Sequence, residues 1–287
     1  MRVGVLGATG SWHSRRLGDA LAAAGHEVVP VPATRIVSEV GAGLFGPDGV
    51  ALHELDVLLV RGLPRGSLEQ VIFRMDALHV LADTGVRVVN SPRALERTID
   101  KSWASALLAR AGVPTPPTVA CERHETAMEA FDRLGGDVVV KPLFGAMGNG
   151  IVRIEDRDLA HRVFRALALE KAVYYLQRTV APPGRRDLRV LVVGGEIAGA
   201  MERVTDSWRA NVAQGGRPRA AALGADERDL ALRAAAALDV HVAGVDLLAG
   251  ADGDATVVEV NGIPGWQALQ SVVDDDLTAR VVASITA

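Results

Sequence analysis

Two acidic residues and an asparagine near the C-terminus are spaced so that a β-hairpin would gather them on one face. The dipeptide Asp252-Gly253 between two apolar runs is typical of a two-residue hairpin turn. Such a turn places Asp246 directly opposite Glu259, and Asn261 shares their face. Two opposed carboxylates repel each other, but with an amide oxygen they form an all-oxygen set that suits Mg²⁺ held partly by substrate phosphates. The alternative interpretation is a solvent-facing acidic pair.

The same hairpin register makes two further predictions. The apolar residues expected to face the core are Val245, Leu247, Val258 and Val260. Because like charges repel, we also expect Asp246→Asn to leave the stability of the metal-free protein unchanged or slightly raised.

A lysine at the end of an apolar strand precedes a glycine-rich stretch. Lys141 closes the run Val138–Lys141, and glycines follow at Gly145, Gly148 and Gly150. The backbone N–H groups of such a loop can approach polyphosphate oxygens closely, and the ammonium group neutralises their charge. The lysine precedes the glycines, so the pattern is not a P-loop. A surface lysine beside a turn is the alternative.

Other cations lie where they could serve the same chemistry. Lys101 follows Asp100 at a predicted helix start, where a cation opposes the helix dipole and therefore hints at a local use. Arg189, Arg203 and Arg209 lie on or near an earlier hairpin. Their guanidinium groups could hold carboxylates or a migrating phosphoryl group, although each could equally be a solvated surface residue.

The glycine-rich N-terminus invites a dinucleotide-binding interpretation that its spacing does not support. In Val3–Gly10 the glycines fall at Gly4, Gly7 and Gly10, which is not the G-x-G-x-x-G fingerprint. No acidic residue follows the second strand, although Arg35 leaves an NADP site open. The favoured interpretation is a tight strand-to-helix turn.

The composition of the chain excludes several classes of protein. The chain has 287 residues, of which 49 % are hydrophobic and 23 % charged, so wholesale disorder is excluded. A net charge of −4 gives no reason to expect nucleic acid as the main partner. The single cysteine, Cys121, excludes an internal disulfide. No apolar stretch reaches about 18 residues and no signal peptide is evident, so we expect a cytoplasmic protein.

The segment before residue 90 alternates strand and helix signals. Apolar strands and amphipathic helices are predicted in turn at Val3–Leu6, Ser14–Ala24, Glu27–Val31, Asp56–Val60, Ser67–Asp83 and Val86–Val89. This βαβ rhythm implies an open parallel sheet with helices on its faces.

The rest of the chain predicts capped helices, short strands and two hairpins. Ser91 and Asp100 are expected N-caps of consecutive helices, and Gly112 and Pro114 end the second helix. The remaining predicted strands and helix are Val138–Lys141, Tyr174–Gln177, Leu188–Val193, Glu196–Met201, Glu227–Leu238, Val242–Leu248 and Ala255–Val260.

The order of these motifs resembles a known family. The motifs are Lys101, the strand and glycine loop Val138–Ile151, YLQRTV (Tyr175–Val180), DLRVLVVGGEIAGAMERV (Asp187–Val204), WRANVAQGG (Trp208–Gly216), AGVDLL (Ala243–Leu248) and VVEVNGIPG (Val257–Gly265). From about residue 90 onward the chain resembles the ATP-grasp superfamily and, within it, the RimK-like α-L-glutamate ligases. In the N-terminal part, Trp12–Leu17 and Gly66–His79 look most like the branch that adds glutamate to tetrahydromethanopterin or related pterins.

The resemblance implies an α/β ATP-grasp fold in four parts. Residues 1–90 would form an N-terminal parallel α/β domain that helps to bind the acceptor, and residues 91–114 linker helices. Residues 115–180 would form a small α+β lid, and residues 181–287 a C-terminal mixed-sheet domain with the metal-binding residues. ATP would lie between the last two.

The resemblance also implies roles for the matching residues. Phosphate contacts are expected from Lys101, Lys141, Gly145, Gly148 and Gly150. Adenine and ribose contacts are expected from Gln177, Arg178, Thr179, Val180 and Asp187. Residues near the transferring phosphate are Arg189, Arg209 and Asn211, the two arginines being catalytic. The expected ligands of Mg²⁺ or Mn²⁺ are Asp246, Glu259 and Asn261. Relatives usually have an acidic residue at the position of Arg178, so adenine would be recognised there mainly by backbone groups.

The implied activity is ATP-dependent amide formation. ATP phosphorylates an acceptor carboxylate, and the amine of L-glutamate attacks the acyl phosphate, which yields an amide, ADP and phosphate. The expected acceptor is a pterin of the tetrahydromethanopterin type, and the alternative is the C-terminus of a ribosomal protein. A nucleotide-binding module without activity is a further alternative, against which the acidic hairpin argues. No membrane or direct nucleic-acid partner is expected, and a homo-oligomer is left open.

Overall fold

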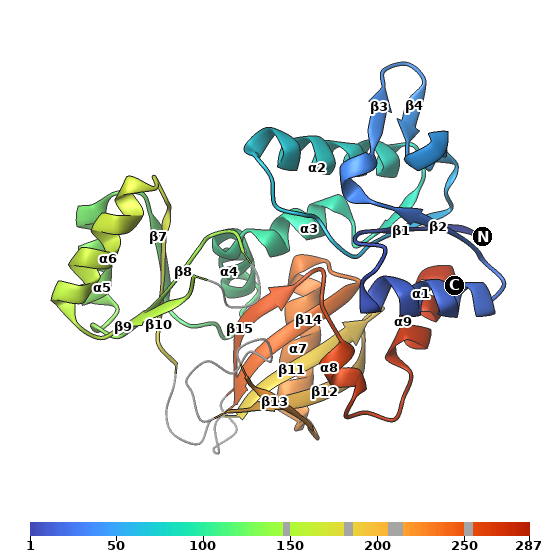
Figure 1. Ribbon diagram of the computed structural model, residues 1–287. Coiled ribbons are helices and arrows are strands. Elements are labelled where there is room, and N and C mark those ends of the chain that lie inside the picture. Colours follow the sequence, from blue (N-terminus) through green and yellow to red (C-terminus); the bar gives the residue numbers. More distant parts are fainter. Residues whose placement is uncertain (146–149, 181–185, 206–214, 250–254) are drawn as a thin grey trace.

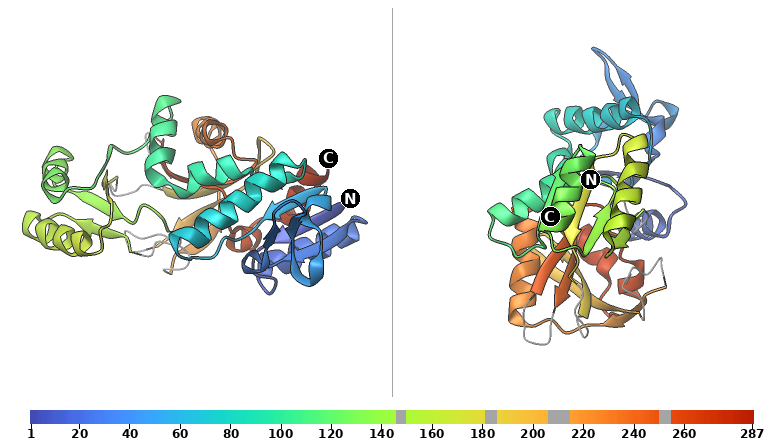
Figure 2. Two further views of the ribbon diagram at one scale, coloured as in Figure 1. Left: turned by 90° about the horizontal axis from the view of Figure 1, so that it is seen from above. Right: turned by 90° about the vertical axis from the view of Figure 1, so that its left-hand side faces the viewer.

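The computed structural model describes residues 1–145, 150–180, 186–205, 215–249 and 255–287. Three β-sheets with helices on their faces carry most of this chain (Figure 1). The views in Figure 2 place the sheet of residues 118–178 in a lobe at one end of the molecule and the N-terminal sheet at the other end. The third sheet lies between them.

The N-terminal sheet is parallel. Its strands, in spatial order, are β2 (Glu27–Val31), β1 (Arg2–Leu6), β5 (Val57–Val60) and β6 (Arg87–Val89). Helix α1 (Trp12–Ala23) packs on one face, and α2 (Leu68–Asp83) packs on the other. Because both faces are covered, the strands are continuous apolar runs. The predicted parallel sheet is confirmed.

A small antiparallel hairpin between β2 and β5 was not predicted. It consists of β3 (Val37–Glu39) and β4 (Gly43–Phe45). Short 3₁₀ turns flank it at Ala33–Arg35, Pro47–Gly49 and Leu52–Glu54. Strands of three residues are too short to show the alternation that identifies a strand in a sequence.

Two consecutive helices lead from the parallel sheet to the rest of the chain, and both predicted N-caps are confirmed. Ser91 Oγ accepts from the Ala94 N–H at 3.1 Å and begins α3 (Pro92–Ile99). Asp100 Oδ1 accepts from the Ser102 N–H at 2.8 Å and begins α4 (Lys101–Arg110). The second cap places Lys101 at the first position of α4.

The second sheet is antiparallel and has helices on one face. Its strands, in spatial order, are β7 (Thr118–Cys121), β10 (Tyr174–Arg178), β8 (Val138–Lys141) and β9 (Val152–Ile154). Helices α5 (His124–Arg133) and α6 (Arg157–Leu169) form a core with this sheet that includes Tyr174 and Leu176. Because side chains alternate along a strand, Tyr175 and Gln177 point to the opposite face.

The third sheet is antiparallel and five-stranded. Its strands, in spatial order, are β13 (Arg217–Ala220), β12 (Glu196–Val204), β11 (Arg186–Val193), β14 (Val242–Ala249) and β15 (Ala255–Asn261). Helix α7 (Ala225–Leu238) covers one face and packs against alternate residues such as Leu188, Val190 and Val245. The predicted β11–β12 hairpin turns at Gly194 and Gly195, whose φ angles of 59° and 81° suit a turn of this kind.

The N-terminal and third sheets are joined by C-terminal helices and by a buried asparagine. Helices α8 (Gln267–Gln270) and α9 (Leu277–Thr286) contribute to a core shared by α1, the parallel sheet and β11. The Asn90 side chain, 2 % exposed, exchanges hydrogen bonds of 2.8 Å with the backbone of Val242 and also donates to the Gly262 carbonyl. Among the described helices, none is both long and apolar enough to cross a bilayer.

Candidate active site

The predicted pairing of the acidic hairpin is confirmed at its polar end. In the β14–β15 ladder Asp246 lies opposite Glu259, and Gly244 lies opposite Asn261. Asp246 is only 6 % exposed. Residues opposite each other in an antiparallel pair share a face, so the two carboxylates and the amide project to the side of the third sheet away from α7.

The register closer to the hairpin turn differs from the prediction by one residue. An irregularity after Asp246 pairs Leu247 with Val257, and Val257, not Val258, is fully buried in the core. The extra residue of a β-bulge reverses the alternation along one strand, which lets Glu259 face the site while Val257 faces α7. The predicted core positions Val245, Leu247 and Val260 are confirmed and Val258 is wrong. The proposed turn Asp252-Gly253 lies outside the described residues.

Two arginines from neighbouring strands flank the acidic pair. Arg189 lies opposite Asp246 in the β11–β14 ladder, and its Nε is 3.0 Å from Asp246 Oδ1. Arg203 Nη2, from β12, is 3.3 Å from the same oxygen. Arg203 Nε also donates to Asp187 Oδ1 at 2.7 Å. Two of the three arginines proposed to handle anions are therefore gathered here, and Arg209 lies outside the described residues.

Burial and mutual charge shape the ionisation of this cluster. Burial raises the pKa of Asp187, and the Asp246 carboxylate raises it further, whereas Arg203 lowers it. Burial lowers the pKa of Arg203, but the Asp246 and Asp187 carboxylates outweigh burial, and the net pKa is raised. Arg203 therefore remains a cation, because the two neighbouring carboxylates stabilise its charged form.

Asp246, Glu259 and Asn261 form an acidic corner whose oxygen donors suit a hard divalent cation. Asp246 Oδ1 is buried and receives no hydrogen bond of acceptable geometry from the residues that the structure describes, although two guanidinium groups lie within ion-pair distance. Such an orphaned oxygen calls for a further positive partner. Within the described residues, no three His, Cys, Asp or Glu side chains gather closely enough to hold a metal. A cation would therefore depend on Asp246, Glu259, the Asn261 amide and phosphate oxygens.

Lys141 reaches this corner from the second sheet. It is 8 % exposed, and its Nζ donates to Gln177 Oε1 at 2.6 Å. Burial lowers the pKa of Lys141; Glu259 and Asp246 act in the opposite direction, and Lys101 adds to the lowering. The lysine of one sheet thus lies within electrostatic range of the carboxylates of another, as an ATP site between the two requires.

Lys101 contacts the start of the glycine loop, whereas its expected contact with phosphates stays a prediction. Its Nζ donates to the Gly145 carbonyl at 2.8 Å. Gly150 has a φ of 75°, and a Cβ there would lie 2.8 Å from Pro142 Cγ, so this position requires glycine. Gly148 lies outside the described residues.

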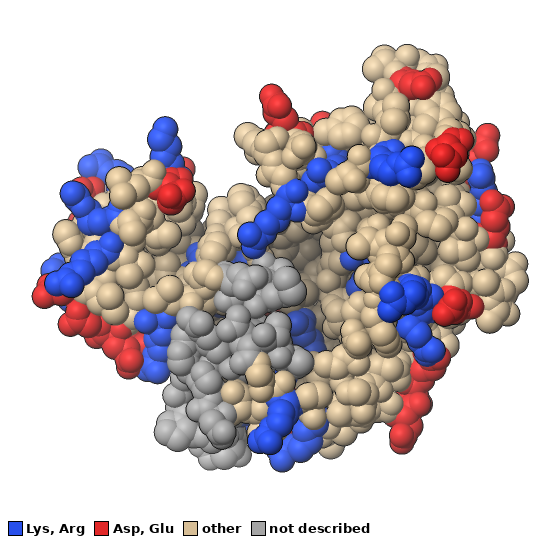
Figure 3. Space-filling view, viewed as in Figure 1, with Lys and Arg blue, Asp and Glu red and all other residues tan. Residues whose placement is uncertain are grey.

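A pocket between the second and third sheets connects these groups. Its polar lining comes from Thr98, Lys101, Ser105, Lys141, Tyr175 and Glu259. The Tyr175 hydroxyl lies 2.8 Å from Ser105 Oγ. Ser105 and Thr98 were not identified from the sequence, because a single hydroxyl on a helix carries no distinctive pattern. Figure 3 shows a hollow near the centre of this side of the molecule with Lys and Arg atoms on its walls.

Only part of the segment predicted to bind adenine, residues 177–180, lies near the pocket. Gln177 contacts Lys141, but Arg178 turns to the end of α5, where its Nε donates to the Leu134 carbonyl at 3.0 Å. The Thr179 N–H donates to the Asp137 carbonyl at 3.0 Å. Arg178 is therefore held by the lobe itself, and its role toward adenine, like that of Val180, stays a prediction.

Two other predicted contacts also stay predictions. Asp187, expected at the ribose, is bound by Arg203 beside the acidic pair. Asn211, expected near the transferring phosphate, lies outside the described residues.

Comparison with known proteins decides the family. A model of the RimK-like ATP-grasp domain matches residues 98–285. The chain belongs to the RimK-like ATP-grasp family. Its members are carboxylate–amine ligases, and this chain is accordingly an ATP-dependent ligase.

Relatives of this chain with high similarity carry two kinds of name. The chain is 34 % identical over 79 % of its length to "Tetrahydromethanopterin:alpha-L-glutamate ligase" of Methanosarcina acetivorans, covering 79 % of that protein. It is 31 % identical over its whole length to "Probable alpha-L-glutamate ligase" of Sodalis glossinidius, covering 97 % of that protein.

A solved structure of the ATP-grasp ligase PsnB, complexed with a minimal precursor, Mg and ADP, has the same fold. It superposes with a TM-score of 0.76 at 22 % identity, covering 99 % of this chain and 97 % of that one. The predicted ATP-grasp fold is confirmed.

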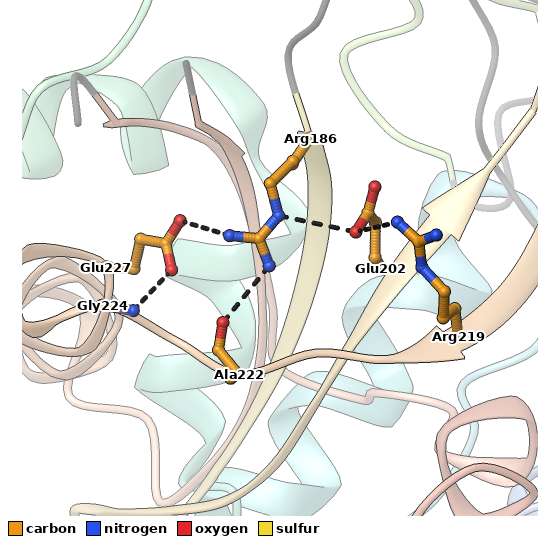
Figure 4. Close-up of polar contacts among 6 residues, drawn as sticks. All are labelled: Arg186, Glu202, Arg219, Ala222, Gly224 and Glu227. Carbon is orange, nitrogen blue, oxygen red and sulfur yellow. Dashed lines mark hydrogen bonds and ion pairs between the residues drawn. The ribbon is translucent and has the colours of Figure 1, made fainter. Parts of the chain in front are cut away.

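A second charged network near the site holds the structure together. Arg186, the first residue of β11, reaches Glu202 of β12 and Glu227 of α7, and also donates to the Ala222 carbonyl (Figure 4). Glu227 accepts from the Gly224 N–H at 2.8 Å at the start of α7. This network clamps the start of β11 next to Asp187.

Proposed function

We propose that this RimK-like ligase adds L-glutamate to a carboxylate of a pterin cofactor of the tetrahydromethanopterin type. The proposal rests on one observation above all, that Lys101, Lys141 and Glu259 line one pocket and that Glu259 is paired with Asp246 there. Cations that suit phosphates face oxygen donors that suit Mg²⁺. Three relatives named as tetrahydromethanopterin:α-L-glutamate ligases, at 34 %, 29 % and 32 % identity, support the acceptor.

The chemistry consists of two transfers at one carboxylate. The γ-phosphoryl group of ATP passes to an acceptor carboxylate oxygen, which forms an acyl phosphate and ADP. The glutamate amine then attacks the acyl carbon, the C–O bond to phosphate breaks, and the amine loses a proton. A bound Mg²⁺ would neutralise phosphate charge during the first transfer.

The side chains of the protein position the substrates and neutralise their negative charge. Lys141 and Lys101 bind phosphate oxygens from the lobe side of the pocket. Arg189, beside Asp246, is placed to stabilise charge on the transferring phosphoryl group or the acceptor carboxylate. Closure of the pocket between the sheets would exclude water from the acyl phosphate.

The experiment measures phosphate release and product mass. Purified protein receives ATP and Mg²⁺ with L-glutamate and a tetrahydromethanopterin-type or folate-type pterin, with each component omitted in turn. We expect phosphate release to require acceptor and amine together, and the pterin to gain one glutamyl residue. ADP formation that is equally fast without any amine would exclude the acyl-phosphate ligase mechanism.

The second candidate is glutamylation of a protein C-terminus. The match over the whole chain to probable α-L-glutamate ligases favours it. A parallel reaction with peptides that copy the C-terminal tails of ribosomal proteins distinguishes the two. Product on the peptide and none on the pterin would replace the leading acceptor.

A further inference from the structure

Arg61 is an enclosed arginine that follows β5 directly. Its Nε is shielded from solvent and has no hydrogen-bond partner among the described residues. Its Nη2 donates to the Pro264 carbonyl at 2.6 Å, and its Cζ lies 4.4 Å from the centroid of the Trp266 ring. In the described part of the chain, no carboxylate lies within ion-pair distance of it, in contrast to Arg189 and Arg203. Burial alone lowers its pKa, to about 10, so Arg61 remains charged at neutral pH.

His13 lies beside this arginine and is held as a neutral ring. The Trp266 N–H donates to His13 Nε2 at 2.9 Å, so Nε2 is the unprotonated nitrogen and Nδ1 carries the proton. Burial, and secondarily the charge of Arg61, lower the pKa of His13 to about 4. The neutral His13 adds no second positive charge next to Arg61, and its Nδ1–H is left as a donor.

The fold places both residues where open parallel sheets bind ligands. The strand order β2–β1–β5–β6 reverses its direction between β1 and β5, and ligands bind at the carboxyl ends of the strands at such a point. The loop after β1 meets the loop after β5, because a Cβ at Gly7 would lie 3.2 Å from the Gly62 nitrogen. Helix α1 starts in the same place with Ser11 as its N-cap, and its dipole favours an anion.

Pro264 connects this position to the acidic pair. A Cβ at Gly244, two residues before Asp246, would lie 2.8 Å from Pro264 Cβ and 2.5 Å from Arg189 Nη1. The Pro264 carbonyl in turn accepts from Arg61. A group bound at Arg61 therefore approaches the acidic corner from the side of the parallel sheet, opposite to Lys141.

We propose that Arg61, with His13 and the Gly7–Gly10 loop, binds a carboxylate of the non-nucleotide substrate. The proposal rests on the ligase function above and assigns a use to the N-terminal glycines. A guanidinium fork and N–H groups match a carboxylate geometrically. The carboxylate can belong to the acceptor or to the incoming amino acid, and both substrates are tested.

The experiment compares Arg61→Gln, Arg61→Lys and a matched control, Arg65→Gln. Arg65 is an exposed arginine of the same loop. Steady-state phosphate release is measured while ATP, the pterin acceptor and L-glutamate are varied one at a time. We expect Arg61→Gln to raise KM for one of the two carboxylate substrates roughly 10- to 100-fold, the effect of losing a charge-assisted contact. KM for ATP should stay unchanged, Arg61→Lys should recover part of the loss, and Arg65→Gln should resemble the wild type.

The outcomes separate the two proposals. A raised KM for the pterin assigns the carboxylate to the acceptor, and a raised KM for glutamate assigns it to the amino acid. Unchanged KM values for both substrates in Arg61→Gln, with active wild-type enzyme, would overturn the carboxylate site and leave the ligase function intact. An equal loss of affinity for ATP would show a general folding defect and would also overturn it. A wild-type protein without turnover on any glutamate–acceptor pair would instead overturn the ligase function.

Discussion

Two clusters of arginines and carboxylates are built around strands β11 and β12, and they differ in how completely their charges are paired. In the outer cluster, Arg186 bridges Glu202 and Glu227, and Arg219 also contacts Glu202; the Arg186 and Arg219 side chains are 37 % and 65 % exposed (Figure 4). In the inner cluster, Arg189 and Arg203 flank Asp187 and Asp246, and their side chains are 17 % and 7 % exposed.

In the inner cluster, a buried carboxylate oxygen lacks a hydrogen-bond donor among the described residues, and burial makes this lack costly in free energy. Within the described part of the chain, Asp246 Oδ1 is buried without a hydrogen bond, whereas Glu202 and Glu227 each accept one or more. A buried oxygen that lacks a donor costs free energy of folding unless a ligand completes it. The outer network satisfies its own charges, whereas the inner one leaves a buried oxygen that a further cation would satisfy.

Asp246→Asn should produce the largest effect, on turnover. The change replaces a carboxylate of the proposed cation site by a neutral amide, which should reduce kcat by roughly 100-fold or more. The carboxylate repulsion considered alone leaves stability unchanged or higher, but the structure reverses this expectation. Asp246 also neutralises buried Arg203 and Arg189, so we expect the metal-free protein to lose on the order of 1–3 kcal/mol.

Denaturant unfolding with and without Mg²⁺-ATP, together with steady-state kinetics, measures both effects of Asp246→Asn. Glu202→Gln, from the outer cluster, is the control and should keep its turnover and its response to Mg²⁺-ATP. Wild-type activity in Asp246→Asn would show that the inner cluster is merely structural.

Lys141 should give ATP binding a pH dependence of intermediate size. Its folded pKa lies below the ordinary value of 10.5, so the unfolded chain binds the extra proton and the lysine destabilises the fold until the pH rises toward that value. Phosphate favours the charged lysine. ATP affinity should therefore fall as the pH rises through the lowered pKa, by at most about tenfold per pH unit.

Calorimetric titration with ATP from about pH 7 to about pH 10 measures this dependence. Lys141→Arg keeps a charge at every pH tested and should flatten the profile, whereas Lys141→Met should bind weakly throughout. An identical slope in wild type and Lys141→Arg would assign the titration to another group.

Arg186→Met should have the smallest effect, confined to stability. Partly exposed ion pairs contribute little, so we expect a loss of about 1 kcal/mol in the free energy of unfolding. Turnover should stay within about twofold of wild type, because Arg186 lies outside the open cluster. A large loss of kcat at unchanged stability would show that the outer network positions Asp187 for catalysis.

Much of this molecule follows from local sequence rules. The helix caps at Ser91 and Asp100 follow from hydrogen bonds within one turn of chain, and the parallel sheet follows from its apolar runs. The opposition of Asp246 and Glu259 follows because a hairpin joins strands that are close in sequence. Such contacts need only short loops, so residue type and spacing determine them.

The tertiary structure alone decided the contacts across sheets. Lys141 of the second sheet comes within electrostatic range of Glu259 of the third sheet, and Arg61 meets Pro264 across more than 200 residues. The bulge that places Val257 in the core could not be predicted from the sequence either, because an extra residue reverses the alternation of side chains between the two faces without changing the composition. These features depend on how separately formed sheets pack, and no periodicity within one segment records which side chain of a distant segment will face it.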